Sequence, residues 1–187
     1  GLNLLEPGHT PHDNEQFLVF LAATLSAVDR HADKLRASAS NPGNDLRLGA
    51  NEAPPAIISA FMGEQLTAVL NNIAQGKETV SKGQQFMTIG VDTLPKLPMD
   101  NSDRNRTSPF AFTGNKFEFR AVGSSASIAF PNTVLNTIVA ESLDFVATEL
   151  EKAVGKSPTP TRVQAAALAL LKKLVKQHKR VLFGGDG

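Results

Sequence analysis

Residues 116–121 alternate between charged and apolar side chains, in the order Lys116, Phe117, Glu118, Phe119, Arg120 and Ala121. Alternation with a period of two predicts a β-strand with one buried face, because successive side chains of a strand point to opposite sides. The other face then carries a cation, a carboxylate and a second cation, each about 7 Å from the next. We refer to Lys116, Glu118 and Arg120 as the charged ladder.

The segment before the ladder contributes two further cations. Arg104 and Arg106 flank an asparagine, and Thr113-Gly114-Asn115 is typical of a tight turn that folds the two pieces into one hairpin. Two interpretations of this charged surface remain open. It suits a ligand with anionic groups bridged by a divalent metal, and it equally suits an ion ladder on a solvated sheet face.

Three long amphipathic helices are predicted from apolar residues that recur at spacings of three and four. The first opens at Asp13, with Gln16 as a capping-box partner, and ends before Asn41. The second starts at Pro131 and runs to about Val154. The third has Thr159 as its N-cap and Pro160 at its first position.

The charges of the first and third helices are interpreted as solvated faces. In the first helix they are Asp29, Arg30, Asp33, Lys34 and Arg36. The end of the third helix is basic, and cations are favourable at a helix C-terminus because of the macrodipole; the residues are Lys172, Lys173, Lys176, Lys179 and Arg180. A phosphate or nucleic-acid patch is the alternative for this basic end.

Shorter elements are predicted between the helices. Residues 1–6 have the pattern of the end of a strand, 56–62 of a short buried strand, and 64–74 of a helix closed by Gly76. Residues 77–100 resemble an insertion that can hold a hairpin. Pro54-Pro55 excludes a helix, so the segment between Arg47 and Pro54 is predicted to be an exposed loop.

Composition narrows the possible functions. The chain has 187 residues, a net charge of +1 and no cysteine, so it can bury a substantial core but has neither thiolate chemistry nor a global charge for nucleic acid. No apolar run reaches the roughly 18 residues that a membrane span needs. His9 and His12, with Asp13, invite a metal interpretation, but their place in a proline-containing loop favours local hydrogen bonding. We find no glycine-rich phosphate loop and no plausible Ser-His-Asp set.

Four stretches in order carry a family resemblance: RLGANEAPPAI, DRNRTSPFAF, GNKFEFRAVGSS and AFPNTVLNTIVAESLD. Together they resemble the catalytic half of glutamine synthetases, and the sequences of these motifs are most similar to the long bacterial class called type III. The match is strongest over residues 41–144. The sequence starts at Gly1 and closes on FGGDG, so we expect it to be a piece of a longer chain.

The resemblance implies an α+β fold, with the antiparallel β-sheet of the glutamine synthetase catalytic domain packed with long amphipathic helices. Residues 1–155 are then part of that catalytic domain, with the insertion at about 64–100. Residues 156–187 are a truncated C-terminal helical extension.

The resemblance also implies an ATP-dependent glutamate–ammonia ligase that forms glutamine through γ-glutamyl phosphate, with Mg²⁺ or Mn²⁺. Glu118 resembles a metal-binding carboxylate. Arg120 and Arg47 resemble arginines that hold the glutamate substrate. Lys116 stands at a basic position that reaches toward the phosphates of ATP.

Two further residues receive catalytic roles from the resemblance. Arg106, which also contacts ATP phosphate, resembles the cation that stabilises the transferring phosphoryl group. Glu52 resembles the glutamate of a flap that shields the acyl phosphate from water and helps to take a proton from ammonium. Many glutamine synthetases carry another ATP-contacting arginine after the RNR motif, where this chain has Ala111.

The family's other metal ligands, and the small β-grasp domain that completes the site across a subunit boundary, lie upstream of this sequence. We therefore expect the isolated chain to be inactive, and its parent to be a cytoplasmic ring-shaped homo-oligomer, a dodecamer, that binds glutamate, ammonium and ATP but neither nucleic acid nor membrane. The alternatives are a non-catalytic glutamine synthetase-like assembly module and a related ligase that joins glutamate to another amine.

Overall fold

The computed structural model describes residues 1–187 except 51–53, 77–78, 81–86, 89–107 and 184–187, and the side chains of Glu64 and of two short strands, β2 and β3. Its helices are η1 (Pro11–Asp13), α1 (Glu15–Arg30), α2 (Ala32–Ser38), α3 (Pro42–Arg47), α4 (Gly63–Gln75), α5 (Ala129–Val154), α6 (Pro160–His178) and η2 (Lys179–Val181). Its strands are β1 (Ala60–Phe61), β2 (Thr79–Val80), β3 (Met87–Thr88), β4 (Phe110–Phe112), β5 (Phe117–Phe119) and β6 (Leu182–Phe183).

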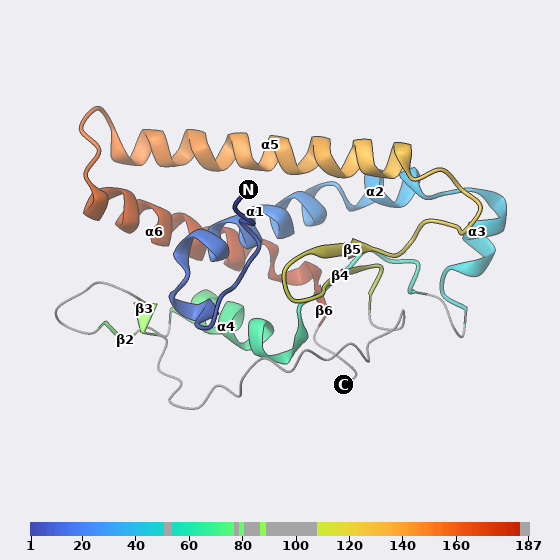
Figure 1. Ribbon diagram of the computed structural model, residues 1–187, viewed down its shortest axis with the longest axis horizontal. Coiled ribbons are helices and arrows are strands. Elements are labelled where there is room, and N and C mark those ends of the chain that lie inside the picture. The colour runs from blue at the N-terminus through green and yellow to red at the C-terminus, as the bar shows by residue number, and fades with distance from the viewer. Residues whose placement is uncertain (51–53, 77–78, 81–86, 89–107, 184–187) are drawn as a thin grey trace.

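The long helices form one layer and the strands lie to one side of it (Figure 1). Helix α1 packs against both α5 and α6, and α4 packs against α6. The contacts are made by apolar stripes: Leu18, Leu21 and Val28 of α1 are fully buried, as are Leu171 and Leu174 of α6. Helix α6 thus belongs to the same core as the rest of the chain.

The helix boundaries follow from local chemistry. Asn14, not Asp13, caps α1, and its side chain accepts a hydrogen bond from the backbone N–H of Phe17 at 3.0 Å. The first predicted helix is divided, because His31 takes a non-helical conformation between α1 and α2. Thr159 caps α6 with Pro160 at its first position, as predicted.

One predicted helix boundary shifts, one agrees, and one predicted strand is absent. Helix α5 begins at Ala129, two residues before Pro131, because proline needs no N–H partner within the first turn of a helix. Helix α4 closes on Gly76, whose left-handed backbone (φ 64°) suits glycine, as predicted. Residues 1–6 form a turn rather than a strand.

Among the described residues, the main sheet has four strands in the order β5-β4-β1-β6. The pair β4–β5 is antiparallel, with Ala111 opposite Glu118, whereas β1 runs parallel to both β4 and β6. The predicted α+β class, with long helices packed on a sheet, is confirmed, but the sheet is mixed rather than antiparallel throughout. Parallel pairs need long connections, and β1 is far from both β4 and β6 in the sequence.

The other strands are short. The strand predicted over 56–62 is reduced to β1, the two residues Ala60–Phe61. Strands β2 and β3 pair antiparallel within the predicted insertion, where a hairpin was expected.

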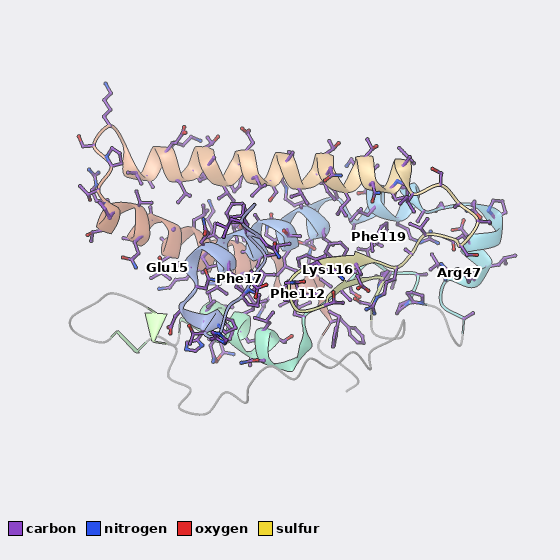
Figure 2. All side chains as sticks on the ribbon, viewed as in Figure 1. Glu15, Phe17, Arg47, Phe112, Lys116 and Phe119 are labelled. Carbon is purple, nitrogen blue, oxygen red and sulfur yellow. The ribbon has the colours of Figure 1, made fainter. Side chains whose placement is uncertain are left out.

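Phenylalanine side chains attach the β4–β5 hairpin to the helical layer. Phe110 and Phe117 stack with ring centroids 4.6 Å apart, and Phe112 lies 5.9 Å from Phe17 of α1. Figure 2 shows Phe17 and Phe112 beside each other between the helices and the hairpin. Burial of these rings fixes which face of the hairpin is turned away from the core.

Candidate functional site

The charged ladder lies on β5 and its two flanking residues, as predicted. Phe117 and Phe119 pack against the hydrophobic core from one face of this strand. Both are half-buried rather than fully buried, because β5 is at the edge of the sheet formed by the described residues. The ladder side chains therefore occupy the opposite face of an edge strand.

The three ladder side chains contact one another. Arg120 donates hydrogen bonds to Oε2 of Glu118 from Nε, at 3.2 Å, and from Nη2, at 3.1 Å. The ammonium of Lys116 lies 3.9 Å from the other carboxylate oxygen, Oε1. Side-chain exposure rises along the ladder, from 14% for Arg120 through 40% for Glu118 to 65% for Lys116. The predicted common face of the three side chains is confirmed.

The carboxylate of Glu118 is held at one oxygen and more open at the other. Both hydrogen bonds that Arg120 donates to Glu118 end on Oε2, while the Lys116 contact at Oε1 exceeds hydrogen-bond length. A carboxylate oxygen with an open position, such as Oε1 of Glu118, is a suitable ligand for a hard divalent cation. No group of three or more potential metal ligands occurs among the residues that the structure describes, His9 and His12 included. Glu118 fits one ligand position and does not make a metal centre alone.

Arg47, at the end of α3, is brought to the far end of the ladder. Its Nε donates to the side-chain oxygen of Asn44 at 2.9 Å, and its Nη2 contacts the carbonyl oxygens of Ala121 at 3.3 Å and Val122 at 3.4 Å. These carbonyls follow Arg120 directly in the chain. Figure 2 places Arg47 beyond Phe119, at the opposite end of the hairpin from Lys116. Two arginines predicted to hold one substrate thus lie at the same strand end.

Two predicted site residues cannot be placed, because Glu52 and Arg106 lie outside the described residues. Ala111 can be placed: it pairs with Glu118 across β4 and β5 and is 1% exposed. Side chains of directly paired residues share a face of the sheet. A cation at position 111 would thus stand beside Glu118, and this chain has a small apolar residue there instead.

A serine, a histidine and an aspartate, which no motif of the sequence brought together, meet between α1 and α6. His178 Nδ1 lies 2.7 Å from an oxygen of Asp29, and His178 Nε2 lies 3.1 Å from Oγ of Ser26. Arg180 donates to the second oxygen of Asp29 at 2.8 Å. This hydrogen bond, together with the negative charge of Asp29, raises the pKa of Arg180.

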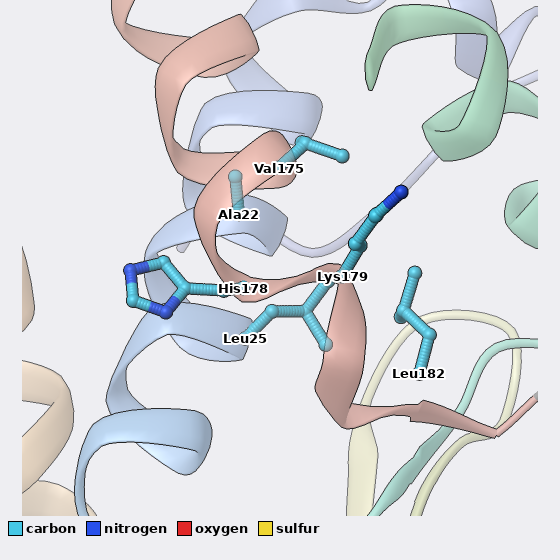
Figure 3. A pocket seen from close by; sticks show the side chains of 6 residues that line it. All are labelled: Ala22, Leu25, Val175, His178, Lys179 and Leu182. Atoms are coloured by element: carbon cyan, nitrogen blue, oxygen red, sulfur yellow. The ribbon is translucent and has the colours of Figure 1, made fainter. Parts of the chain in front are cut away.

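This set is a buried tie between helices rather than a catalytic triad. Ser26 lies within α1 and is 1% exposed, so a substrate carbonyl cannot approach its oxygen. The adjacent small pocket is lined mainly by apolar side chains, among them Leu25 and Val175, and has no room for a water molecule (Figure 3). The sequence missed the tie because Asp29 was assigned to a solvated face, whereas its side chain is only 8% exposed.

Glu141 of α5 forms a second charged tie, to α1 and to the break that follows it. It accepts a hydrogen bond from Arg30 at 2.7 Å and lies 3.2 Å from His31 Nε2. Burial pushes the pKa of Glu141 upward, but the hydrogen bonds and charges of His31 and Arg30 outweigh it, so the pKa is lowered. Arg30 was also predicted to be on a solvated face; its partner is more than a hundred residues away.

Comparisons with known proteins agree with the motifs. No family model matches the chain. It is 56% identical over 187 residues to a protein named type-3 glutamine synthetase from Dictyostelium discoideum. It is also 41% and 43% identical to proteins named glutamine synthetase from Bacteroides fragilis and Butyrivibrio fibrisolvens. Each match covers the whole chain but only about a quarter of the relative (25%, 26% and 26%). The resemblance to glutamine synthetases, the type-3 class included, is confirmed.

Proposed function

We propose that this chain, which matches proteins named glutamine synthetase over its whole length, forms the glutamate-binding side of the active site of a glutamate–ammonia ligase. The observation that carries the proposal is the common face of Glu118 and Arg120, with Arg47 held at the end of the same strand. The carboxylate of Glu118, which can bind a metal, thus lies near Arg120 and Arg47, which can bind the carboxylates of glutamate. The parent protein is the catalyst in this proposal.

The reaction has two steps. ATP transfers its γ-phosphoryl group to the γ-carboxylate of glutamate, and ammonia then displaces phosphate from the acyl carbon to give glutamine. Arg120 and Arg47 bind and orient glutamate, because guanidinium groups match carboxylates in shape and charge. Arg106 offsets the charge that develops on the transferring phosphoryl group, and Lys116 attracts the phosphates of ATP. Glu52 accepts a proton from ammonium and helps to exclude water.

Glu118 would supply one oxygen ligand to Mg²⁺ or Mn²⁺, and such an ion would offset the negative charge of the phosphates. Such an ion takes about six oxygen ligands, so most of them come from outside the described residues. The role of Glu118 in this chain is to hold Arg120 by Oε2 and to present Oε1.

Assembly and location are part of the same proposal. The parent forms a ring-shaped homo-oligomer, a dodecamer, in which neighbouring subunits complete each site, and it works in the cytoplasm. Within the described residues, no helix is both long and apolar enough to cross a bilayer. Residues 1–155 belong to the catalytic domain, with the insertion at about 64–100. Residues 156–187 belong to the helical extension, of which α6 packs on α1 and α4.

The test is phosphate release by the parent protein, measured with glutamate, ammonium, ATP and either Mg²⁺ or Mn²⁺. Replacing Glu118 by Gln keeps the shape of the side chain but removes its charge, so it should weaken metal activation and lower turnover about 100-fold or more. Glu149→Gln is the matched control, because Glu149 is paired with Lys152 and Lys173 away from the ladder. Equal activity of both variants would contradict the role of Glu118.

The same assay separates the alternatives. A parent that releases phosphate only when ammonium is replaced by another amine is a related γ-glutamyl ligase. A parent that releases no phosphate with any amine, while it still assembles, is a non-catalytic module. Only dependence on glutamate and ammonium together supports the proposal.

A further inference from the structure

We infer that Asn44 is a positioning residue that sets the guanidinium of Arg47 for a carboxylate ligand. Asn44 lies within the short helix α3 and is only 4% exposed. A buried amide must have its polar atoms paired, and Asn44 meets this requirement with groups from separate segments. This inference rests on the proposed function for the identity of the ligand, but not for the positioning itself.

The hydrogen bonds of Asn44 join three parts of the chain. Its Nδ2 donates to the carbonyl of Ala39, after α2, at 2.6 Å and to the carbonyl of Ala121, after the ladder, at 2.7 Å. Its Oδ1 accepts from Nε of Arg47 at 2.9 Å. Both amide hydrogens are thus used, and the oxygen is committed to Arg47. One side chain thereby fixes α3 relative to the residue that follows Arg120.

These contacts determine which part of Arg47 can meet a ligand. Nε is occupied by Asn44, and Nη2 is occupied by the carbonyls of Ala121 and Val122. Nη1 makes no hydrogen bond to a described residue. The bonds from Nη2 are long, at 3.3 and 3.4 Å, whereas the bond to Asn44 is short. Asn44 is therefore the stronger of the two restraints on the guanidinium plane.

The neighbouring backbone agrees with this role. A Cβ atom built at Gly123 would lie 3.5 Å from Oδ1 of Asn44, so the loop after the ladder packs directly on the amide. Replacing Asn44 by Ala would leave the carbonyls of Ala39 and Ala121 without their donor and Arg47 Nε without its acceptor. Replacing it by Asp would keep an acceptor but set a carboxylate against the two carbonyls.

The first experiment measures steady-state kinetics in the parent protein for Asn44→Ala, Arg47→Ala and the double variant. Asn44→Ala should raise KM for glutamate about 10- to 100-fold and leave KM for ATP within about two-fold, because misplacing a binding group by about 1 Å has effects of this size. In the Arg47→Ala background the same change should add little. An equal increase in both backgrounds would overturn the inference, because Asn44 would then act without Arg47.

The second experiment does not depend on catalysis. Phenylglyoxal modifies accessible arginine side chains, and peptide mass spectrometry can report the rate at Arg47 in the parent protein. Asn44→Ala should speed this modification several-fold, and Asn44→Asp, which retains an acceptor, should speed it less. An unchanged rate in Asn44→Ala overturns the inference. A parent without glutamine formation would remove the proposed function, while this measurement would still decide the role of Asn44.

Asn41→Ala is the matched control for both experiments. Asn41 caps the same helix by accepting from the N–H of Asn44 at 2.9 Å, so its loss destabilises α3 without removing a bond to Arg47. We expect KM for glutamate and the modification rate to stay within about two-fold of the parent. A loss of glutamate affinity equal to that of Asn44→Ala would assign the effect to helix stability and overturn the inference.

Discussion

His178 Nδ1 lies 2.7 Å from a carboxylate oxygen of Asp29, although the two residues are 149 positions apart. The contact ties the end of α6 to the last turn of α1. Strand β6 begins four residues after His178 and pairs with β1, in the sheet that holds the charged ladder. The tie thus helps to fix where the chain enters the sheet.

We expect Asp29→Ala to lower the free energy of local opening of α1 and α6 by about 2 kcal/mol, because it leaves the buried side of His178 without its partner. Hydrogen–deuterium exchange of the two helices in the parent protein measures this. Ser26→Ala should have a smaller effect, about 1 kcal/mol. Labelling of Ser26 by a fluorophosphonate probe would contradict its assignment as a buried structural residue.

Stability should depend on pH through Glu141. Its folded-state pKa is lowered from 4.5, so the stabilisation is complete above that value and is lost as the pH falls through the folded-state pKa. Because the side chain is 45% exposed, Glu141→Gln should cost only about 0.5 kcal/mol at neutral pH. It should also flatten the decline in stability below about pH 4.5. Glu151→Gln, on the exposed side of α5, serves as the control in acid-unfolding curves.

Arg120→Ala in the parent protein should raise KM for glutamate about ten-fold or more, because a hydrogen bond to a charged group contributes about 1.5–3 kcal/mol. Lys116→Ala should instead raise KM for ATP. Steady-state kinetics with each substrate varied in turn separates the two effects. Unchanged glutamate kinetics in Arg120→Ala would remove this residue from the substrate site.

Glu52→Ala should leave ATP binding largely intact and lower the rate of glutamine formation, because its assigned work begins only after the acyl phosphate forms. Equilibrium binding of ATP and turnover at saturating substrate test the two halves of this statement. Weaker ATP binding with normal turnover at saturation would be inconsistent with a flap residue.

The 187-residue chain, assayed alone, should not release phosphate in response to glutamate and ammonium with either magnesium or manganese. Glu118 offers a single carboxylate, and no group of three potential metal ligands occurs among the described residues. Hard divalent cations need about six oxygen ligands. Turnover by the chain near the rate of its parent would show that no ligands from outside the chain are needed.

Features encoded within a few residues were predictable. The alternation at residues 116–121 determines one face of a strand, and Thr159-Pro160 determines a helix start, because both depend on neighbours in the sequence. The pairing of Asp29 with His178, and of Glu141 with Arg30, depends on helices that meet only after folding. No periodicity records such partners, so buried or paired charges were taken for solvated ones.

The site residues also differ in whether local sequence or tertiary packing determines their placement. The common face of Glu118 and Arg120 follows from strand geometry, whereas the bonds of Arg47 to Asn44 and to the carbonyl of Ala121 depend on how α3 packs against the strand end. The motif that resembles glutamine synthetases includes Arg47 but does not predict the orientation of its side chain. That orientation depends on the buried amide of Asn44, to which no motif assigned a role.

The parallel pairing of β1 with β6 also means that β1 is synthesised well before its partner strand. Ala60 pairs with Leu182, and a ribosome that adds about 5–20 residues per second needs about 6–24 seconds to make the chain between them. Throughout that interval one edge of β1 has exposed N–H and C=O groups that another strand could pair with. Contacts this distant in sequence also form slowly, since a long loop must close before they are made. Synthesis of this segment therefore includes a period in which mispairing competes with folding, and chaperones that bind extended apolar segments would act during it.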